Sequence, residues 1–366
     1  MNTFFSIYEH NVRSGDFSGG AFAYYRLPGT DHYTFISQQG RPKELAALDI
    51  SDTFRGFVIA PFVISQESPL ILLEPDFTTK LPVPDTKAES TTHVMPQNDD
   101  SLRRKAYTHS FEAMHRRLME GKAGKIVLSR RMALCNPTSA QPWKPTTFFR
   151  EACRKYPHHY VCLWWTQRTG CWLIASPETL LKKVDDKQWQ TMALAGTMNW
   201  NGCKDKDIAS AWSLKNIEEQ QYVATYIERQ LFPHVRQLST SPTYSSRAAE
   251  LAHLRTDFTF QIQENANLGL LLKCLHPTPA VCGVPQDTAL QAILEDEDSP
   301  RKYYAGFSGP VNWQDESQLY VSLRCMEIDS QKALLYAGGG LLKESHEEEE
   351  WAETQKKMRT MLKLFR

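Results

Sequence analysis

Three charged residues near the C-terminal end of the sequence have a spacing that could place them on one face of a helix. Glu350, Glu353 and Lys357 stand at positions i, i+3 and i+7, and at roughly 100° per residue they share one side. A neighbouring apolar stripe contains Trp351, Met358, Leu362 and Phe365. Acids and a lysine beside such a stripe could line a cleft. The alternative is that acids in the first turn only offset the helix dipole, which is the role expected of residues 347–349.

A further carboxylate stands on the face of a predicted helix that should be buried. Glu219 lies three, four and seven residues before the apolar positions Tyr222, Val223 and Tyr226, so it heads a stripe that faces the core. A buried carboxylate is costly unless it is paired or bound to a cation. A salt bridge and a metal ion explain Glu219 equally well. Carboxylates without a neighbouring His or Cys suit a hard cation such as Mg²⁺, which completes its shell with water and substrate.

Two more charged residues flank apolar runs. Lys125 opens a strand-like run in which Val127 and Ser129 share its face. A lysine at such a position is usually a solvated edge residue, but a lysine that faces a cleft can serve as a general base. Glu178 follows an apolar run that ends in Ala175-Ser-Pro. On its own it would be an ordinary turn acid.

These residues need helices and strands to position them. Helical spacing and capping signals predict helices over residues 101–121, from 214 onward, after Asp287 as N-cap, and from Ser345, where Ser345-His-Glu-Glu348 has the pattern of a capping box. Runs rich in Val, Ile, Leu and aromatic residues predict strands over residues 125–134, 160–165, 171–175, 180–184, 189–194, 319–328 and 333–337. The strands come in clusters rather than in strict alternation with helices, which favours an α+β fold over a doubly wound parallel sheet.

Composition excludes several classes of protein. Lys and Arg (42) balance Asp and Glu (42), so the electrostatic signature of a nucleic-acid binder is missing, and nothing indicates a membrane protein. The first ten residues lack the basic flank and apolar centre of a signal peptide. The eight cysteines never form C-x-x-C, so free thiols in a reducing compartment are expected rather than a disulfide framework. A cytoplasmic location follows as an expectation.

Common catalytic motifs are also missing. There is no Walker A loop, and the cluster Gly338-Gly339-Gly340 does not extend to G-x-G-x-x-G because Lys343 replaces the last glycine. His346 is followed by four glutamates rather than by the spacing of H-E-x-x-H. Ser308 lies one residue short of a nucleophile elbow. Phosphate-loop, zinc-hydrolase and serine-hydrolase chemistry therefore have no support in the sequence.

Taken together, the chain resembles the chorismate-utilising enzymes, a family that includes isochorismate, salicylate, anthranilate and aminodeoxychorismate synthases. The matching segments occur in the family's order over roughly residues 100 to 366. They are residues 124–130 (GKIVLSR), 175–181 (ASPETLL), 194–197 (LAGT), 213–220 (SLKNIEEQ), 251–256 (LAHLRT), 276–283 (HPTPAVCG), 304–309 (YAGFSG), 319–324 (LYVSLR), 336–340 (YAGGG) and 350–357 (EWAETQKK). Each motif is weak alone, but the ordered set is specific.

The resemblance implies a fold and a division of the chain. The expected fold is a single large α+β domain of antiparallel sheets packed as a sandwich, with helices on the outside. Residues 1–100 would be the weakly matching N-terminal part of this domain, ending in a polar loop over residues 80–100 that is rich in Pro, Thr, Ser and Asp. Residues 101–366 would be the catalytic region that binds chorismate.

The resemblance also implies a role for each matching residue. Lys125 would be the general base and Glu178 the general acid. Glu219 and Glu353 would bind Mg²⁺, and Glu350 would hold a metal-bound water. The substrate contacts would be Gly196, Thr197, His253, Arg324, Gly338, Gly339 and Lys357.

Two positions point to the reaction. Lys125 matches the lysine of isochorismate and salicylate synthases, whereas Ala195 stands where aminodeoxychorismate synthases place a nucleophilic lysine. The implied activity is Mg²⁺-dependent conversion of chorismate to isochorismate, without an amidotransferase subunit, by a monomer or weak homodimer. The alternatives are a salicylate synthase, which also eliminates pyruvate, and a catalytically silent homologue. Whether the product would enter menaquinone or siderophore biosynthesis stays open.

The chain departs from the family pattern at three positions. Gln220 stands where many relatives have His, Asn216 where an acid is frequent, and Gly339 where Ala is more usual. The missing acid at residue 216 is expected to weaken Mg²⁺ binding. No departure removes a residue that would touch the metal or the substrate.

Overall fold

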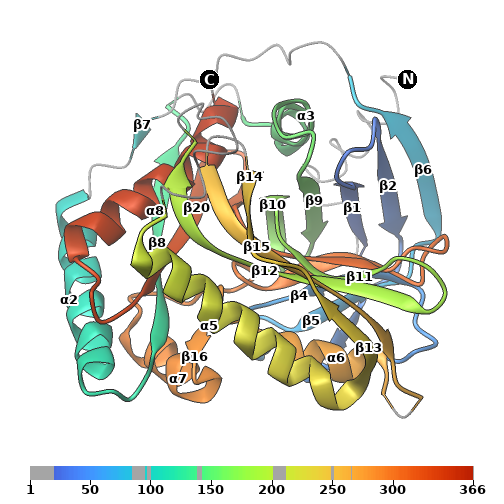
Figure 1. Ribbon diagram of the computed structural model, residues 1–366. Coiled ribbons are helices and arrows are strands. Elements are labelled where there is room, and N and C mark those ends of the chain that lie inside the picture. The colour runs from blue at the N-terminus through green and yellow to red at the C-terminus, as the bar shows by residue number, and fades with distance from the viewer. Residues whose placement is uncertain are drawn as a thin grey trace.

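The computed structural model describes residues 20–84, 95–96, 100–137, 142–200, 212–248, 251–264 and 266–365. Figure 1 shows two sheets with helices around them. The helices are α2 (Asp100–Met119), α3 (Pro145–Lys155), α5 (Leu214–Leu231), α6 (Leu268–Leu275), α7 (Gln286–Asp296) and α8 (Glu347–Leu362), with 3-10 turns at Phe232–His234 and Lys363–Phe365.

The described strands form two ten-stranded sheets in which each pair of neighbours is antiparallel. The first sheet has the order β16 (Gly283–Val284), β8 (Lys125–Cys135), β20 (Lys332–Leu341), β19 (Cys325–Ile328), β10 (Gly170–Ser176), β9 (Tyr160–Thr166), β1 (Ala21–Arg26), β2 (His32–Gln38) and β6 (Phe77–Pro82), and β7 (Met95–Pro96) pairs with β8.

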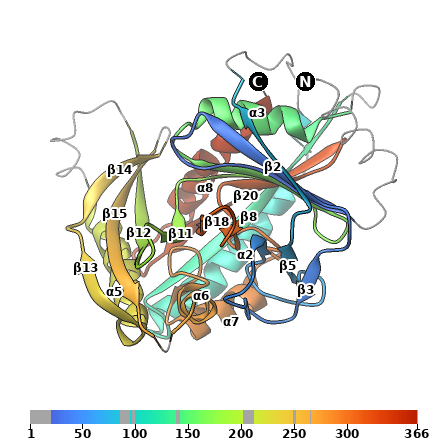
Figure 2. The same cartoon turned by 90° about the vertical axis from the view of Figure 1, so that its right-hand side faces the viewer.

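The second sheet has the order β13 (Val235–Thr240), β15 (Leu251–Ile262), β12 (Gln188–Asn199), β11 (Thr179–Lys183), β18 (Gln318–Val321), β17 (Phe307–Val311), β4 (Gly56–Ala60), β5 (Leu70–Leu73) and β3 (Lys43–Leu45), and β14 (Tyr244–Ala248) pairs with β15. This architecture confirms the α+β prediction. Figure 2 shows the second sheet, with α5 against it, beside the first sheet.

The central strands β1, β9 and β10 of the first sheet are largely apolar and buried on both faces. In β1, Phe22 and Tyr24 belong to an outer cluster with Phe149 of α3, whereas Ala23 and Tyr25 belong to the core between the sheets. This division follows from the period of two along a strand. Helix α3 therefore covers the outer face of the sheet. The sequence analysis did not predict this helix or α6.

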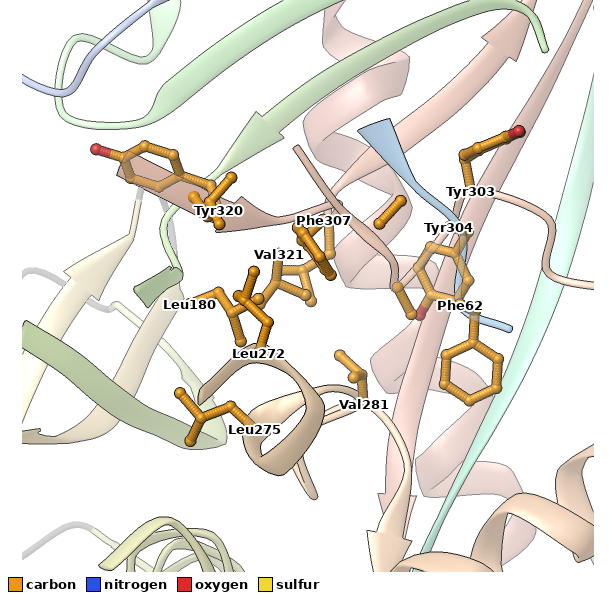
Figure 3. Packing of buried hydrophobic residues seen from close by; sticks show 14 of the residues in the cluster. Phe62, Leu180, Leu272, Leu275, Val281, Tyr303, Tyr304, Phe307, Tyr320 and Val321 are labelled. Carbon is orange, nitrogen blue, oxygen red and sulfur yellow. The ribbon is translucent and has the colours of Figure 1, made fainter. Parts of the chain in front are cut away.

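The main core lies between the sheets. Phe307 and Val321 from β17 and β18 pack in one cluster with Leu272 of α6, and Figure 3 shows these side chains close together. Val281 and Tyr304 belong to the same cluster and also line the candidate site described below. The apolar core thus continues into the wall of the site.

Two segments cross from one sheet to the other. The predicted strand 319–328 is wrong as a single element, because β18 belongs to the second sheet and β19 to the first. In the same way β10 and β11 lie in different sheets, with Pro177 and Glu178 between them. The backbones of the two crossings are hydrogen-bonded, since Arg324 and Ala175 exchange N–H···O bonds of 2.9 and 3.1 Å. Arg324 and Glu178 are consequently brought together at the junction of the sheets.

The starts of two helices differ from prediction. Asp287 lies inside α7, whose N-cap is Pro285. Ser345 does not form a capping box: the N-cap of α8 is His346 without a side-chain bond, and the Ser345 hydroxyl donates to Glu350 Oε1 at 2.7 Å. The serine serves a buried carboxylate rather than the helix backbone.

The N-terminal strands are integral to both sheets, since β1, β2 and β6 extend the first sheet and β3, β4 and β5 the second. The polar segment 80–100 contains more regular structure than predicted, because β6 reaches Pro82, β7 pairs with β8 and α2 begins at Asp100. Residues 85–94 and 97–99 lie outside the described residues. Among the helices of the described ranges, none has the length and apolar character needed to cross a bilayer. The seven cysteines in those ranges are free thiols.

Candidate active site

A pocket lies where the two crossing segments meet β12, β15 and β20. Of the residues predicted from the sequence, the following line it: Glu178, Gly196, Thr197, Glu219, His253, Arg324, Gly338 and Lys357.

The other predicted residues do not line the pocket but lie directly behind the residues that do. Lys125 touches the lining residue Glu219, and Glu353 touches the lining residue Lys357. Glu350 and Gly339 adjoin each other beside Glu353. The structure therefore gathers every predicted site residue at one place, although Lys125, Gly339, Glu350 and Glu353 are not on the surface of the pocket.

Glu178 is held by its backbone at the crossing between the sheets. Its N–H donates to Ser176 Oγ at 3.1 Å, and its carbonyl accepts from the N–H of Val321 at 3.1 Å. Only 3% of the residue is exposed. Burial raises the pKa of Glu178 to about 7, although the charges of Arg324, Lys125 and Lys357 act in the opposite direction. A carboxyl with this pKa can give up a proton near neutral pH.

A bulge in β12 presents a second group of polar atoms. The pairing of β12 with β15 shifts between Ala195 and Met198, and Gly196 there has φ of +68°, which favours glycine. The carbonyl of Gly196 accepts from Nδ1 of His253 at 2.9 Å. Nε2 of His253 then accepts from Nη2 of Arg324, 3.4 Å away.

Burial and the neighbouring cations keep His253 neutral. They lower its pKa to about 3, with Arg324 and Lys357 as the nearest charges. A neutral imidazole that donates through Nδ1 must be an acceptor at Nε2. The histidine therefore fixes the direction of the Arg324 guanidinium, which leaves the other N–H groups of Arg324 for an anionic ligand.

Lys125 and Glu219 form a buried ion pair beneath Gly340. Nζ of Lys125 lies 2.9 Å from Oε1 of Glu219, and the lysine is fully buried. Despite this distance, Nζ has no well-directed hydrogen-bond acceptor among the described residues. A Cβ at residue 340 would collide with the Glu219 carboxylate and lie 2.7 Å from Cε of Lys125. A side chain at residue 340 would therefore force Glu219 and Lys125 to move.

Helix α8 brings two carboxylates and a lysine to the site, as its spacing predicted. Lys357 Nζ lies 2.6 Å from Glu353 Oε1 and donates to the carbonyl of Gly338 at 2.9 Å. Burial acts to raise the pKa of Glu353, but Lys357 together with Lys215 outweighs it, so the pKa is lowered and the carboxylate stays charged. Burial raises the pKa of Glu350, whose Oε2 has no hydrogen-bond partner among the described residues.

Residues outside the prediction complete the surroundings. Lys215 of α5 contacts Glu350 Oε1. Tyr304 lines the pocket, and its hydroxyl would lie 2.9 Å from a Cβ at Gly338. Lys215 and Tyr304 both lie inside the segments quoted for the resemblance. Lys215 precedes Glu219 by one helical turn. A search for charged residues one turn from each candidate acid would therefore have found this lysine.

Two of the departures from the family pattern have structural roles. Gln220 accepts from the Ala195 N–H at 2.9 Å and donates to the Ala193 carbonyl at 3.2 Å, so it supports the bulge of β12. Asn216 accepts from the Thr197 N–H at 3.4 Å through Oδ1. Within the described residues, no three His, Cys, Asp or Glu side chains are close enough together to hold a metal ion.

The comparisons with known proteins identify the family. The sequence pattern of the family described as chorismate binding enzyme matches residues 64–366. The chain belongs to this family. The match begins before the segments quoted from the sequence, so it includes β5 and β6 of the N-terminal part.

Named relatives agree with this assignment. The chain is 29% identical over 341 residues to isochorismate synthase DhbC of Bacillus subtilis strain 168, covering 89% of this chain and 81% of that one. It is 31% identical over 268 residues to isochorismate synthase MenF of Escherichia coli K12, covering 70% of this chain and 60% of that one. The solved structure of the Escherichia coli MenF shares the fold at a TM-score of 0.78 and 24% identity, covering 94% of this chain and 89% of that one.

Proposed function

We propose that the protein is an isochorismate synthase, which interconverts chorismate and isochorismate in the presence of Mg²⁺. The observation that carries this proposal is the meeting around one pocket of a buried carboxyl group with a raised pKa, two cationic side chains and a buried lysine just behind the wall. Two relatives with this kind of match are named isochorismate synthases. The substrate is expected to be a small dicarboxylate, and no amidotransferase subunit is required.

Lys125 and Glu178 are suited to complementary proton transfers. Lys125, when neutral, would take a proton from a water molecule as the oxygen of that water bonds to ring carbon C2. The double bonds would shift, and the hydroxyl on C4 would leave with a proton from Glu178. Because Glu178 has a pKa of about 7, a large share of it is protonated near neutral pH. Paired acid and base assistance of this kind requires a neutral lysine and a protonated glutamate at the same time.

Arg324 and Lys357 would bind the carboxylates of the substrate. The guanidinium of Arg324 is oriented by His253 and buried beside Glu178, and its fork can bind a carboxylate through two parallel hydrogen bonds. Lys357 reaches the pocket from α8. Val281, Tyr304 and Leu323 also line the pocket and would contact the ring.

The carboxylates fit a small cation that prefers oxygen ligands. Glu219 and Glu353 would hold Mg²⁺, with the unpartnered Oε2 of Glu350 as an acceptor for one of its waters. When bound, Mg²⁺ supplies positive charge that anchors the carboxylate of the substrate. Glycines 339 and 340 leave room at these carboxylates, since a Cβ at either position would crowd Glu350 or Glu219.

The test is conversion of chorismate by the purified protein with and without Mg²⁺, with products separated by chromatography. An equilibrium mixture of chorismate and isochorismate, formed only with Mg²⁺ and without pyruvate, is the expected result. Salicylate with an equal amount of pyruvate would replace the proposal with salicylate synthase. No conversion at saturating Mg²⁺ would reject both activities and leave a catalytically silent chorismate-binding protein.

A further inference from the structure

One charged residue beside the site has no part in the proposed reaction. Lys215 lies in the first turn of α5, four residues before Glu219, so the two side chains share one face of the helix. The turn itself is fixed, because the N-cap Ser213 accepts from the Asn216 N–H at 3.2 Å. Lys215 therefore has a defined position relative to the proposed metal ligand on the same helix.

Lys215 links this helix to the other helix that carries carboxylates. Its Nζ contacts Oε1 of Glu350 in α8. Among the ion pairs of the described residues, it is the one that joins α5 to α8. Each helix supplies one of the proposed Mg²⁺ ligands, Glu219 and Glu353. The Lys215–Glu350 contact thus spans the two halves of the candidate metal site.

The bonding of Glu350 is one-sided. Ser345 Oγ donates to Oε1 at 2.7 Å, the same oxygen that Lys215 contacts, and Ser345 in turn accepts from the Leu342 N–H at 3.0 Å. With Oε1 held by two donors, Oε2 is buried without a partner. A Cβ at Gly339 would lie 3.0 Å from this Oε2 and 3.8 Å from Oε1 of Glu353. Both oxygens therefore approach the same point of β20.

A buried carboxylate oxygen without a donor is costly, and such atoms usually await a ligand or a water. If Lys215 served only to neutralise Glu350, either oxygen would suffice and nothing would require the second to stay free. The arrangement instead fixes the rotation of the carboxylate and leaves one oxygen available beside Glu353.

We infer that Lys215 is a positioning residue for the cation site: it braces α5 against α8 and aims Oε2 of Glu350 at a metal-bound water. The inference rests on the proposed Mg²⁺ site. Residues that orient metal ligands or their waters usually change metal affinity by roughly 10–100-fold when they are replaced. Lys215 does not touch the pocket, so its loss should weaken Mg²⁺ binding while leaving the chemical step nearly intact.

The experiment is calorimetric titration of the full-length protein with MgCl₂ in the absence of substrate. We expect Lys215→Met to weaken Mg²⁺ binding by about tenfold or more, and Lys215→Arg to restore most of the affinity. The matched control is Lys155→Met, which removes a lysine of similar exposure (22% against 23%) from an ion pair with the buried Glu151. It should bind Mg²⁺ as the wild type does.

Kinetics and a double-mutant cycle give independent readouts. For Lys215→Met the Mg²⁺ concentration needed for half-maximal rate should rise, while kcat at saturating Mg²⁺ stays close to wild type. If the pair acts as a unit, Lys215→Met combined with Glu350→Gln should weaken Mg²⁺ binding no more than the worse single variant.

Several results would overturn the inference. They are unchanged or tighter Mg²⁺ binding by Lys215→Met, equal weakening by Lys155→Met, additive effects in the cycle, or no Mg²⁺ binding by the wild type. A wild type that binds Mg²⁺ but does not convert chorismate would reject the proposed function alone, because the titration still decides the role of Lys215.

Discussion

The outer face of the first sheet and the pocket at its junction with the second sheet are both buried, but their chemistry is opposite. On the outer face, Phe149 of α3 lies 5.6 and 5.3 Å from the rings of Tyr24 and Tyr33, and regular strands supply alternating apolar side chains. At the pocket, Lys125 and Glu178 are equally hidden from water. Burying charge is expensive even in pairs.

This difference shows which parts of the fold can place charged and polar side chains in a buried position. The outer face is built from regular strands, whereas several residues in and around the pocket stand at irregular places: the two crossings between sheets, the bulge of β12 and the first residue of β8. At such places backbone N–H and C=O groups are freed from the ladders and can bind side chains. The carbonyl of Gly196, bonded to His253, is an example.

The largest effect should come from removing the base. Lys125→Met keeps the apolar stem of the side chain but deletes the amine, and we expect a loss of activity of about 10²–10⁴-fold. Glu219 borders the pocket and can be hydrated there, so the variant should remain folded at the assay temperature. The measurement is kcat with circular dichroism on the same sample. Activity within a few-fold of wild type would remove Lys125 from the mechanism.

On the apolar side the expected effect is on stability alone. Phe149→Ala opens a cavity under α3 and should lower the free energy of unfolding by about 3–5 kcal/mol. The pocket shares no residue with this cluster, so kcat per folded molecule should not change. Denaturant unfolding and assays at low temperature test both statements. If Phe149→Ala lowered kcat as much as Lys125→Met does, the outer face would not be functionally separate from the pocket.

A smaller effect should appear in the pH dependence of stability. The pKa of Glu178 rises from 4.5 in the unfolded chain to about 7 in the fold, so the folded state binds the proton more tightly. Its contribution to stability is therefore present below pH 4.5 and is lost as the pH rises through 7. Glu178→Gln removes this dependence, which at about 1.4 kcal/mol per pKa unit amounts to at most about 3 kcal/mol.

The measurement is denaturant unfolding of wild type and Glu178→Gln at pH 5 and pH 8. The variant should gain stability relative to wild type on going from pH 5 to pH 8. His253 titrates in the opposite sense, since its lowered pKa favours the fold at higher pH, but it is present in both proteins and cancels in the difference. Identical pH profiles would show that Glu178 is not buried in its protonated form.

The smallest effect is expected at Gly339. A methyl group there would lie 3.0 Å from Oε2 of Glu350, a distance that a small movement of the carboxylate relieves. Gly339→Ala should change stability by no more than about 1 kcal/mol and leave activity nearly intact. Gly340→Ala, whose Cβ would collide with Glu219, is the contrasting variant, and equal assay results for the two would contradict the described packing.

The sequence predicted side chains on regular elements better than side chains at breaks. The spacing of Glu350, Glu353 and Lys357 placed them correctly on one face, because in a helix the spacing between residues determines the side on which each side chain lies. The prediction of a single strand over residues 319–328 was wrong, because the sequence of an apolar run does not show whether the run stays in one sheet or crosses to the other. That crossing is what places Arg324 at the pocket.

Other misses have similar causes. Helix α6 is only eight residues long, too short for its period to stand out from that of a strand. Ser345 fitted a capping box in sequence, but its hydroxyl donates to the buried carboxylate of Glu350 instead of capping the helix backbone. The link from Lys215 to Glu350 joins residues 135 positions apart, and local patterns carry no information on such a contact.

The pairing of β8 with β20 has a consequence for how the protein is made. Lys125 leaves the ribosome long before residues 332–341, which form the longest partner of its strand. A nascent chain that lacks them exposes the bare edge of β8, a template for wrong pairing, beside a lysine whose burial depends on Gly340. The site therefore cannot form before β20 has been synthesised, and between the synthesis of these two strands the edge of β8 is open to wrong pairing.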